Sequence, residues 1–184
     1  LDSILKLNIT PAIEADRFGH LVIQDTDGRM KPINTYASEL IRKLSKKHVY
    51  QTFDANQVFL SMQESPQLWY NVPLIYLKAK KADTIRTLLG LNKTAKYAAL
   101  VDFLSPNLDY KLGPYLEDAY GAQVPTAIQK IFKETDQRVS LLFNTLEGSA
   151  LRLYPIPNDE NNTWVSSKGF REGGYVLKDS LYGN

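Results

Sequence analysis

The sequence predicts an α+β fold, in which short hairpins and strands pack with several helices. Apolar residues recur at three- and four-residue steps over 126–146, which predicts one long helix. Short runs of apolar and β-branched residues are bounded by Asp, Gly and Pro, which is typical of short strands and hairpins. The order of these segments lacks the regular strand–helix alternation of a parallel α/β fold.

The composition is that of a globular domain and excludes several classes of function. Of the 184 residues, 43% are hydrophobic and 23% charged, which is enough apolar material for a core. The formal net charge is only +2, so we expect no nucleic-acid partner. Cysteine is absent, which excludes disulfides and thiolate metal sites. No run approaches the roughly 20 apolar residues that span a bilayer, and no signal-peptide pattern occurs.

The first element in chain order is a predicted hairpin. Its strands are expected at Phe18–Gln24 and Arg29–Ile33, with a turn at Asp25–Gly28 between them. Gly28 allows the tight turn because glycine tolerates positive φ. Pro32 lacks a backbone N–H, so it ends the second strand and delivers the chain to the next element.

A helix should follow, with Asn34 or Thr35 as its N-cap. Its apolar face has helical spacing and consists of Ala37, Leu40, Ile41 and Leu44. The basic stretch Arg42–His48 closes it, where positive charges complement the helix dipole. We interpret that stretch as a solvated helix end.

The middle of the chain alternates short elements. Asp54 and Gln57 match a capping box, so a helix begins there, with Val58, Phe59 and Met62 buried. Ser65–Pro66 ends it, and a strand is expected at 74–77. Asp83 should cap a short helix that stops before Gly90. The segment 97–104 fits either a strand or a helix, 105–113 is a loop, and 114–119 is helical.

The long helix is expected from Thr126 to about Leu146, with Gly148 after it. Its periodic positions are Ile128, Ile131, Phe132, Thr135, Val139, Leu142, Phe143 and Leu146. Asp136 and Arg138 within it are candidates for ion pairs. A strand over Ala150–Ile156 should place Arg152 and Tyr154 on one side. A polar turn covers 157–162, and the tail 167–184 is interpreted as a helix start or a flexible end.

No constellation of residues predicts catalysis or metal binding. Neither His20 nor His48 has a carboxylate at the spacing of an HExxH metal motif. A nucleophile elbow and a phosphate-binding glycine loop are both missing, and paired acids such as Asp25 and Asp27 fall in turns. We therefore predict no catalytic residue and no metal site in this chain.

Two stretches nevertheless form long, specific phrases: RFGHLVIQDTDGRMKPINTYASELIRKL at 17–44 and LRLYPIPNDENNTWVS at 151–166. The segments DANQVFLSMQESPQLWYNVPLI and TDQRVSLLFNT lie between them at corresponding spacing. Together these resemble the extracytoplasmic segment of bacterial cytochrome c biogenesis proteins of the ResB/CcsA type (System II). The chain is most similar in pattern to the fused CcsBA form of Bacteroidetes and some ε-proteobacteria. The resemblance runs from about Ala15 to Ser166.

The resemblance implies that residues 1–184 are a single extracytoplasmic (periplasmic) domain of a larger multi-pass membrane protein. That parent would export haem and, as a haem lyase or synthetase, help attach it to apocytochrome c. Its cofactor would be haem. Its partners would be apocytochrome c, haem and the membrane-embedded remainder of the same polypeptide. The family's Trp-rich segment has no match here, since Trp69 and Trp164 stand apart. No catalytic or haem-ligating residue is therefore carried over.

Several polar side chains could still serve such a domain. Arg29 and Lys31 are expected on one strand face, where they could meet haem propionates or an acidic partner. His20, Arg152 and Tyr154 are further candidates, and a plain exposed strand face is the alternative. Three functions stay open: an accessory or apocytochrome-contacting domain of a haem-handling protein, an interaction module that never meets haem, and an unrelated periplasmic hydrolase.

Overall fold

The computed structural model describes residues 2–173, and their fold is mixed α+β, as the sequence predicts. The helices are α1 (Asp2–Leu7), α2 (Ala12–Gly19), α3 (Ile33–Ser45), α4 (Ala55–Glu64), α5 (Pro66–Trp69), α6 (Asp83–Leu89), α7 (Gly113–Gly121), α8 (Ala127–Leu146) and α9 (Ser167–Glu172). Two 3₁₀ helices within the same range are η1 (Lys80–Ala82) and η2 (Leu100–Phe103). The strands are β1 (Val22–Gln24), β2 (Met30–Pro32), β3 (Ile75–Tyr76), β4 (Tyr97–Ala98), β5 (Arg152–Pro155) and β6 (Trp164–Ser166). They pair antiparallel as β1–β2, β3–β4 and β5–β6.

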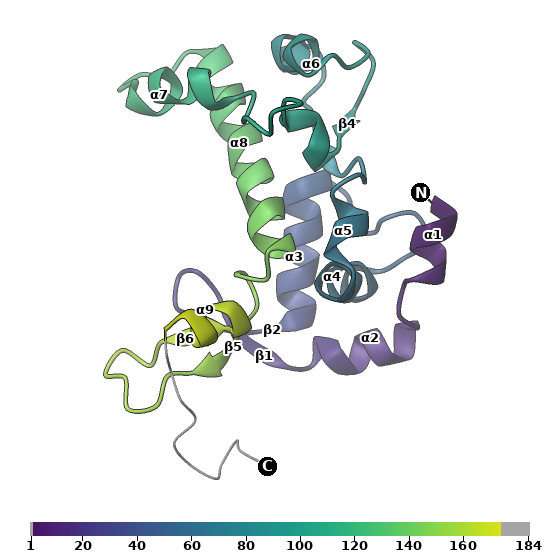
Figure 1. Cartoon of the computed structure of the whole chain (residues 1–184), viewed down its shortest axis with the longest axis vertical. Coiled ribbons are helices and arrows are strands. Elements are labelled where there is room, and N and C mark those ends of the chain that lie inside the picture. The colour runs from purple at the N-terminus through teal and green to yellow at the C-terminus, as the bar shows by residue number, and fades with distance from the viewer. Residues whose placement is uncertain (1, 174–184) are drawn as a thin grey trace.

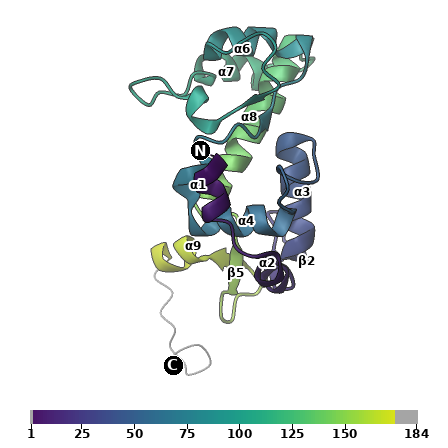
Figure 2. The same ribbon diagram turned by 90° about the vertical axis from the view of Figure 1, so that its right-hand side faces the viewer.

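Helices α3 and α8 run through the middle of the molecule (Figure 1). Helix α8 packs against α3 and α4, and α2, α3 and α4 pack on one another. The β1–β2 and β5–β6 hairpins lie at one end of this bundle, whereas α6 and α7 lie at the other (Figures 1 and 2). The molecule therefore has a hairpin end and a helical end, joined by two central helices.

The central helices form where their apolar periodicity predicts them. The predicted face of α3 is buried throughout: Ala37, Leu40, Ile41 and Leu44 are at most 2% exposed. Helix α4 begins with the predicted capping box, in which Asp54 Oδ1 accepts the Gln57 N–H at 2.9 Å. Thr126 caps α8 in the same way, with its hydroxyl accepting the Gln129 N–H at 3.2 Å. These caps satisfy backbone donors that the first helical turn leaves free.

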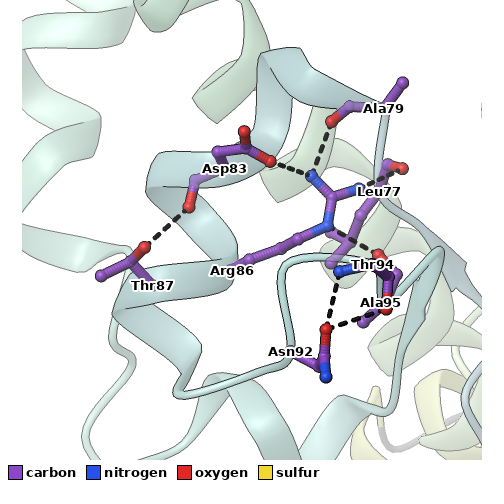
Figure 3. Close-up of polar contacts among 8 residues, drawn as sticks. All are labelled: Leu77, Ala79, Asp83, Arg86, Thr87, Asn92, Thr94 and Ala95. Carbon is purple, nitrogen blue, oxygen red and sulfur yellow. Dashed lines mark hydrogen bonds and ion pairs between the residues drawn. The ribbon is translucent and has the colours of Figure 1, made fainter.

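A buried arginine organises the loops at the helical end (Figure 3). The Arg86 guanidinium donates to the carbonyl oxygens of Leu77 at 2.9 Å and of Ala79 and Ala95 at 2.6 Å. It also pairs with Asp83 Oδ1 at 3.0 Å. One side chain thus holds β3, η1 and the turn before β4 around α6, a role that the sequence did not reveal.

The first predicted strand is wrong over its first half. Phe18 and Gly19 end α2, and only Val22–Gln24 forms strand. Phe18 stacks on Phe59 of α4, with ring centroids 6.1 Å apart. A Cβ at Gly19 would lie 2.6 Å from Asn56 Nδ2, so the glycine permits close packing of α2 on α4. Packing on α4 therefore wins over the β-propensity of the segment.

The predicted caps of α3 and α6 are also wrong. Helix α3 begins at Ile33, with Pro32 in the N-cap position, so neither Asn34 nor Thr35 caps it. The Ile33 N–H donates to the Leu21 carbonyl at 2.8 Å, which ties the helix start directly to the hairpin. Asp83 is the first residue of α6 and pairs with Arg86 rather than capping. Gly90 ends α6 as predicted, with φ of +73°.

Three further segments either differ from the sequence prediction or decide between its alternatives. Residues 97–104 divide into β4 and η2, so both readings of this segment hold in part. Ile128 and Phe143 belong to the predicted buried face of α8 but are 57% and 46% exposed. Part of the tail forms α9, capped by Ser166, whose hydroxyl accepts the Gly169 N–H at 3.1 Å. The rest of the tail, 174–184, lies outside the described residues.

Candidate functional site

The two sequence phrases meet at the hairpin end of the molecule, although more than a hundred residues separate them. Strand β1 contacts β5 and β6. The link is Gln24, which is 6% exposed. Its Nε2 donates to the Asn162 carbonyl at 3.0 Å and to the Gly28 carbonyl at 3.2 Å, and its Oε1 accepts the Trp164 N–H at 2.7 Å. A single amide therefore joins the turn of the first hairpin to the backbone of the second.

Asp25 builds the turn beside this link. Its Oδ1 accepts the backbone N–H groups of Asp27 and Arg29, both at 2.9 Å, and its Oδ2 accepts Lys31 Nζ at 2.9 Å. Burial acts to raise the pKa of Asp25, but the Lys31 ammonium and the two N–H groups outweigh it and hold that pKa below its usual range. Gly28, with φ of +80°, completes the turn.

Lys31 lies between two carboxylates rather than open to a ligand. Its Nζ is 2.9 Å from Asp25 Oδ2 and 3.0 Å from Glu39 Oε2 of α3. These hydrogen bonds raise the pKa of Lys31 against the opposing effect of burial. The ammonium is already balanced by two negative charges, so Lys31 ties β2 to α3 and is poorly placed to bind a haem propionate.

Tyr36 of α3 is largely buried beside Lys31 and Asp25. Burial raises the pKa of its phenol, which a hydrogen bond with Thr145 of α8 and the nearby charges of Lys31 and Arg152 partly offset. Its ring meets Phe59 edge-on, with centroids 5.5 Å apart. Two of the predicted candidates, Lys31 and Arg152, are thus brought together around a residue that the sequence did not single out.

The other candidates do not join this group. His20 and Arg29 are exposed and lie near opposite ends of the β1–β2 hairpin, because His20 precedes β1 and Arg29 follows the turn. His20 Nδ1 contacts the Asp16 carbonyl at 2.8 Å. Among the described residues, no carboxylate lies within 4.0 Å of the Arg29 guanidinium. The structure therefore offers no single cationic face made of Arg29, Lys31 and His20.

Tyr154 points to a different neighbour. A register shift separates Arg152 from Tyr154 in β5, so the expected regular alternation along this strand is broken. The Tyr154 ring packs on Phe170 of α9, with centroids 5.6 Å apart. The charge of Arg152 acts to lower the pKa of Tyr36, whereas Tyr154 packs on α9.

Sequence reasoning missed Gln24, Asp25, Tyr36 and Glu39 as parts of this region. A glutamine at the buried end of a short strand carries an amide that needs partners, and that was a usable signal. The identity of those partners was out of reach, because Asn162 and Trp164 lie far along the chain. Asp25 was interpreted only as a turn residue, which it is, in addition to its pairing with Lys31.

The residues between 2 and 173 contain no cluster of metal-ligating side chains. No group of three or more His, Asp or Glu side chains among them could hold a metal ion. Both histidines are exposed and lie in separate loops, His20 just after α2 and His48 in the segment after α3. An apolar pocket of about 270 Å³ lies between η2, α5 and α8, lined by Tyr70, Leu100, Phe103, Leu104, Tyr110, Val139, Ser140 and Phe143. It contains no imidazole or thioether, and its volume is below the roughly 300–1,000 Å³ of drug-sized ligand sites.

The phenols of that pocket are held protonated. Burial, together with a hydrogen bond to Glu147 at 2.7 Å, raises the pKa of Tyr70 to about 12. Burial and a hydrogen bond to Asp136 at 2.9 Å likewise raise the pKa of Tyr110. A haem-ligating tyrosinate would need the opposite shift, a lowered pKa.

Among residues 2–173, every helix is too short or too polar to span a membrane.

Comparison with known proteins gives one informative similarity. No family model matches the chain. Protein NrfI of Wolinella succinogenes is 32% identical over 155 residues, which make up 82% of this chain but 16% of NrfI. The chain thus corresponds to about one sixth of the length of that relative, and the matched part covers most of the fold described above.

Proposed function

We propose, with the similarity to NrfI as the premise, that this chain serves cytochrome c biogenesis. In this proposal it is an extracytoplasmic domain of a membrane-bound haem-exporting and haem-attaching protein. It acts there as an accessory scaffold or as a surface that contacts apocytochrome c. The observation that carries the proposal is the 32% identity with NrfI over 155 residues. The resemblance of stretches 17–44 and 151–166 to the ResB/CcsA family points the same way.

The geometry at the hairpin end favours a scaffold over a haem ligand. Both phrases pack into one unit through Gln24, so their residues serve a shared structural purpose. Lys31 is occupied by Asp25 and Glu39, and the described histidines lie apart. A rigid, fully satisfied junction of this kind is suited to holding a surface in shape.

A haem titration of the purified 184-residue chain tests the scaffold role. Haem added in steps should produce no saturable Soret band shift, because the scaffold role assigns no side chain of this chain to the haem iron. A saturable band that is weakened by His20→Ala or Arg29→Ala would overturn the scaffold role and restore haem contact. The chain is then passed over an immobilised apocytochrome segment that carries Cys-x-x-Cys-His. A pure scaffold should flow through, whereas an apocytochrome-contacting domain should be retained.

The gene that encodes the chain tests the membrane part of the proposal. Segments of roughly 20 apolar residues beside this region, together with a Trp-rich loop and flanking histidines, are expected in the same reading frame. An open reading frame without any such segment would contradict a membrane-bound parent. This result is independent of the haem titration, because it does not depend on how the 184-residue chain behaves alone.

A further inference from the structure

The basic residues at the end of α3 contact two different elements: Lys43 and Lys46 lie beside α8, and Lys47 lies beside β4. Lys46 ends the helix in the left-handed conformation, with φ of 61°, and the chain turns away there. Lys43 and Lys46 line a pocket of about 250 Å³ against α8, whose contributions are Glu134, Gln137, Arg138 and Leu141. The stretch is therefore more than a solvated helix end, because two of its lysines face a concavity.

Arg138 fixes the floor of this pocket. Its side chain is 12% exposed, and its Nε donates to the Lys43 carbonyl at 3.3 Å, which ties α8 to the end of α3. Its Nη2 lies 3.6 Å from Glu134 Oε2, and Lys78 Nζ reaches the same carboxylate at 3.9 Å. Of the two candidates for ion pairs in α8, Arg138 thus pairs with Glu134, whereas Asp136 accepts the hydroxyls of Tyr110 and Tyr120.

The charges around the pocket are unbalanced. Arg138 and Lys78 share the single carboxylate of Glu134. Among the described residues, no carboxylate lies within 4.0 Å of Lys43 or Lys46. Cations that converge on a concave, partly desolvated surface focus positive potential there. The pocket is thus suited to an anionic group supplied from outside.

The positive surface continues past the pocket onto the β3–β4 pair. Lys47 Nζ lies over the Tyr97 ring, 5.2 Å from its centroid, and Tyr97 meets Tyr76 edge-on at 5.9 Å. Both tyrosines are half-buried. Aromatic rings next to cations favour the binding of a peptide at this surface, because the rigid rings give a large contact area and lose little conformational entropy.

We propose that this α3–α8 pocket binds an acidic segment of a protein partner. One carboxylate enters between Lys43, Lys46 and Arg138, and Leu141 packs against the carbon chain of that acidic residue. The concave shape and the low exposure of Arg138 favour a peptide over a membrane surface, which a flat field of exposed lysines would suit better. The inference is independent of the proposed function, because it does not use the hairpin junction.

The test uses the complete 184-residue chain and a hexaglutamate peptide as the probe. Binding is followed by NMR through the backbone amide shifts, at low and at raised salt. Hexaglutamate should shift amides of Lys43, Lys46 and Arg138, whereas hexaglutamine should leave them unchanged. The double variant Lys43→Gln/Lys46→Gln should weaken binding about tenfold, as expected for the loss of two charge contacts made by exposed lysines. Raised salt should weaken binding further, because the contacts are ionic.

A matched control removes two positive charges elsewhere. Lys6→Gln/Arg171→Gln changes the net charge equally, and both of its positions are exposed, on α1 and α9. Retained affinity in this control supports the pocket, whereas an equal loss in both double variants would overturn it in favour of a bulk charge effect. Unshifted amides at the pocket would overturn it as well.

Two competing anions complete the test. Inorganic phosphate that displaces hexaglutamate at similar concentration would replace the peptide proposal with a small-anion site. Vesicles containing anionic phospholipid that shift the same amides, while hexaglutamate does not, would replace it with a membrane contact. Because both double variants replace only exposed basic residues, their circular dichroism spectra should match that of the wild type.

Discussion

At the scale of single residues, Arg86 shows how one buried charge can hold several loops together at the helical end of the molecule. It is 2% exposed, and its guanidinium meets three backbone carbonyls and Asp83 (Figure 3). A buried charge is costly unless its donors are satisfied, and here four hydrogen bonds provide that. No local sequence signal identifies such a residue, because its partners are backbone oxygens of three other segments.

Replacement of Arg86 by Met should destabilise the chain strongly. The carbonyl oxygens of Leu77, Ala79 and Ala95 would lose their donor, at a cost of about 3 kcal/mol in the free energy of unfolding. For a chain of this size that corresponds to a fall in Tm of about 10 °C. Thermal unfolding followed by circular dichroism measures it. Arg42→Met, at an exposed position of α3, serves as the control and should stay within about 0.5 kcal/mol of wild type.

Asp25 should make the hairpin end sensitive to acid. Its pKa is lowered in the folded chain, so its contribution to stability is present above the unfolded pKa of about 3.9 and is lost as pH falls through the folded value. Asp25→Asn should therefore be less stable than wild type at neutral pH and should lose less stability on acidification. Urea unfolding from pH 7 down to pH 3 checks this. Parallel curves for the two proteins would show that Asp25 contributes nothing through its charge.

At the scale of elements, local signals predicted the starts of helices well where a capping box was present. Asp54–Gln57 and Thr126–Gln129 cap α4 and α8, because each box closes on itself within four residues. The start of α3 was misplaced because Ile33 is fixed by the distant Leu21 carbonyl rather than by a side-chain cap. The last two residues of α2, Phe18 and Gly19, were misassigned because their contacts with α4 are tertiary.

One carboxylate holds α7 and the preceding loop to α8. Asp136 accepts the Tyr110 hydroxyl at 2.9 Å and the Tyr120 hydroxyl at 2.8 Å. Burial, together with this hydrogen bond, raises the pKa of Tyr120 to about 12. The two phenols explain why an acidic residue is tolerated on the buried face of α8.

Asp136→Leu should release α7 from α8 without unfolding the bundle. Both phenols would lose their acceptor, which costs about 1–3 kcal/mol and falls mainly on the docking of α7. Hydrogen exchange should quicken in Gly113–Gly121 while α3 and α4 keep their protection. Uniform exchange across the chain would show instead that the pair of tyrosines supports the global fold. The Tyr120 phenol should also ionise at a lower pH in this variant, as tyrosinate absorbance would report.

At the scale of the whole molecule, the α+β class and most of the helices followed from periodicity and turn residues, whereas the candidate site did not. Arg29 and Lys31 were predicted to share one strand face, with His20 as a further candidate. In the structure, His20 and Arg29 lie apart and Lys31 is paired with two carboxylates. What unites the site is contact between segments more than a hundred residues apart, through Gln24 and around Tyr36. Such contacts leave no periodic trace in one sequence.

The joined hairpins are proposed to serve cytochrome c biogenesis, and Gln24 is the residue at which this role can be tested. Gln24→Leu removes the bonds to Asn162 and Trp164 while keeping the apolar side of the residue. Gln123→Leu, at an exposed position, is the matched control. Both changes are made in the full parent gene, in cells that depend on it for c-type cytochromes.

The decisive measurement is the amount of holocytochrome c in those cells, set against the amount of parent protein on an immunoblot. We expect Gln24→Leu to lower holocytochrome c several-fold at an unchanged level of parent protein, and Gln123→Leu to leave it at the wild-type level. Wild-type amounts of holocytochrome c in the Gln24→Leu cells, with hydrogen exchange of the variant chain showing the hairpins loosened, would contradict this role.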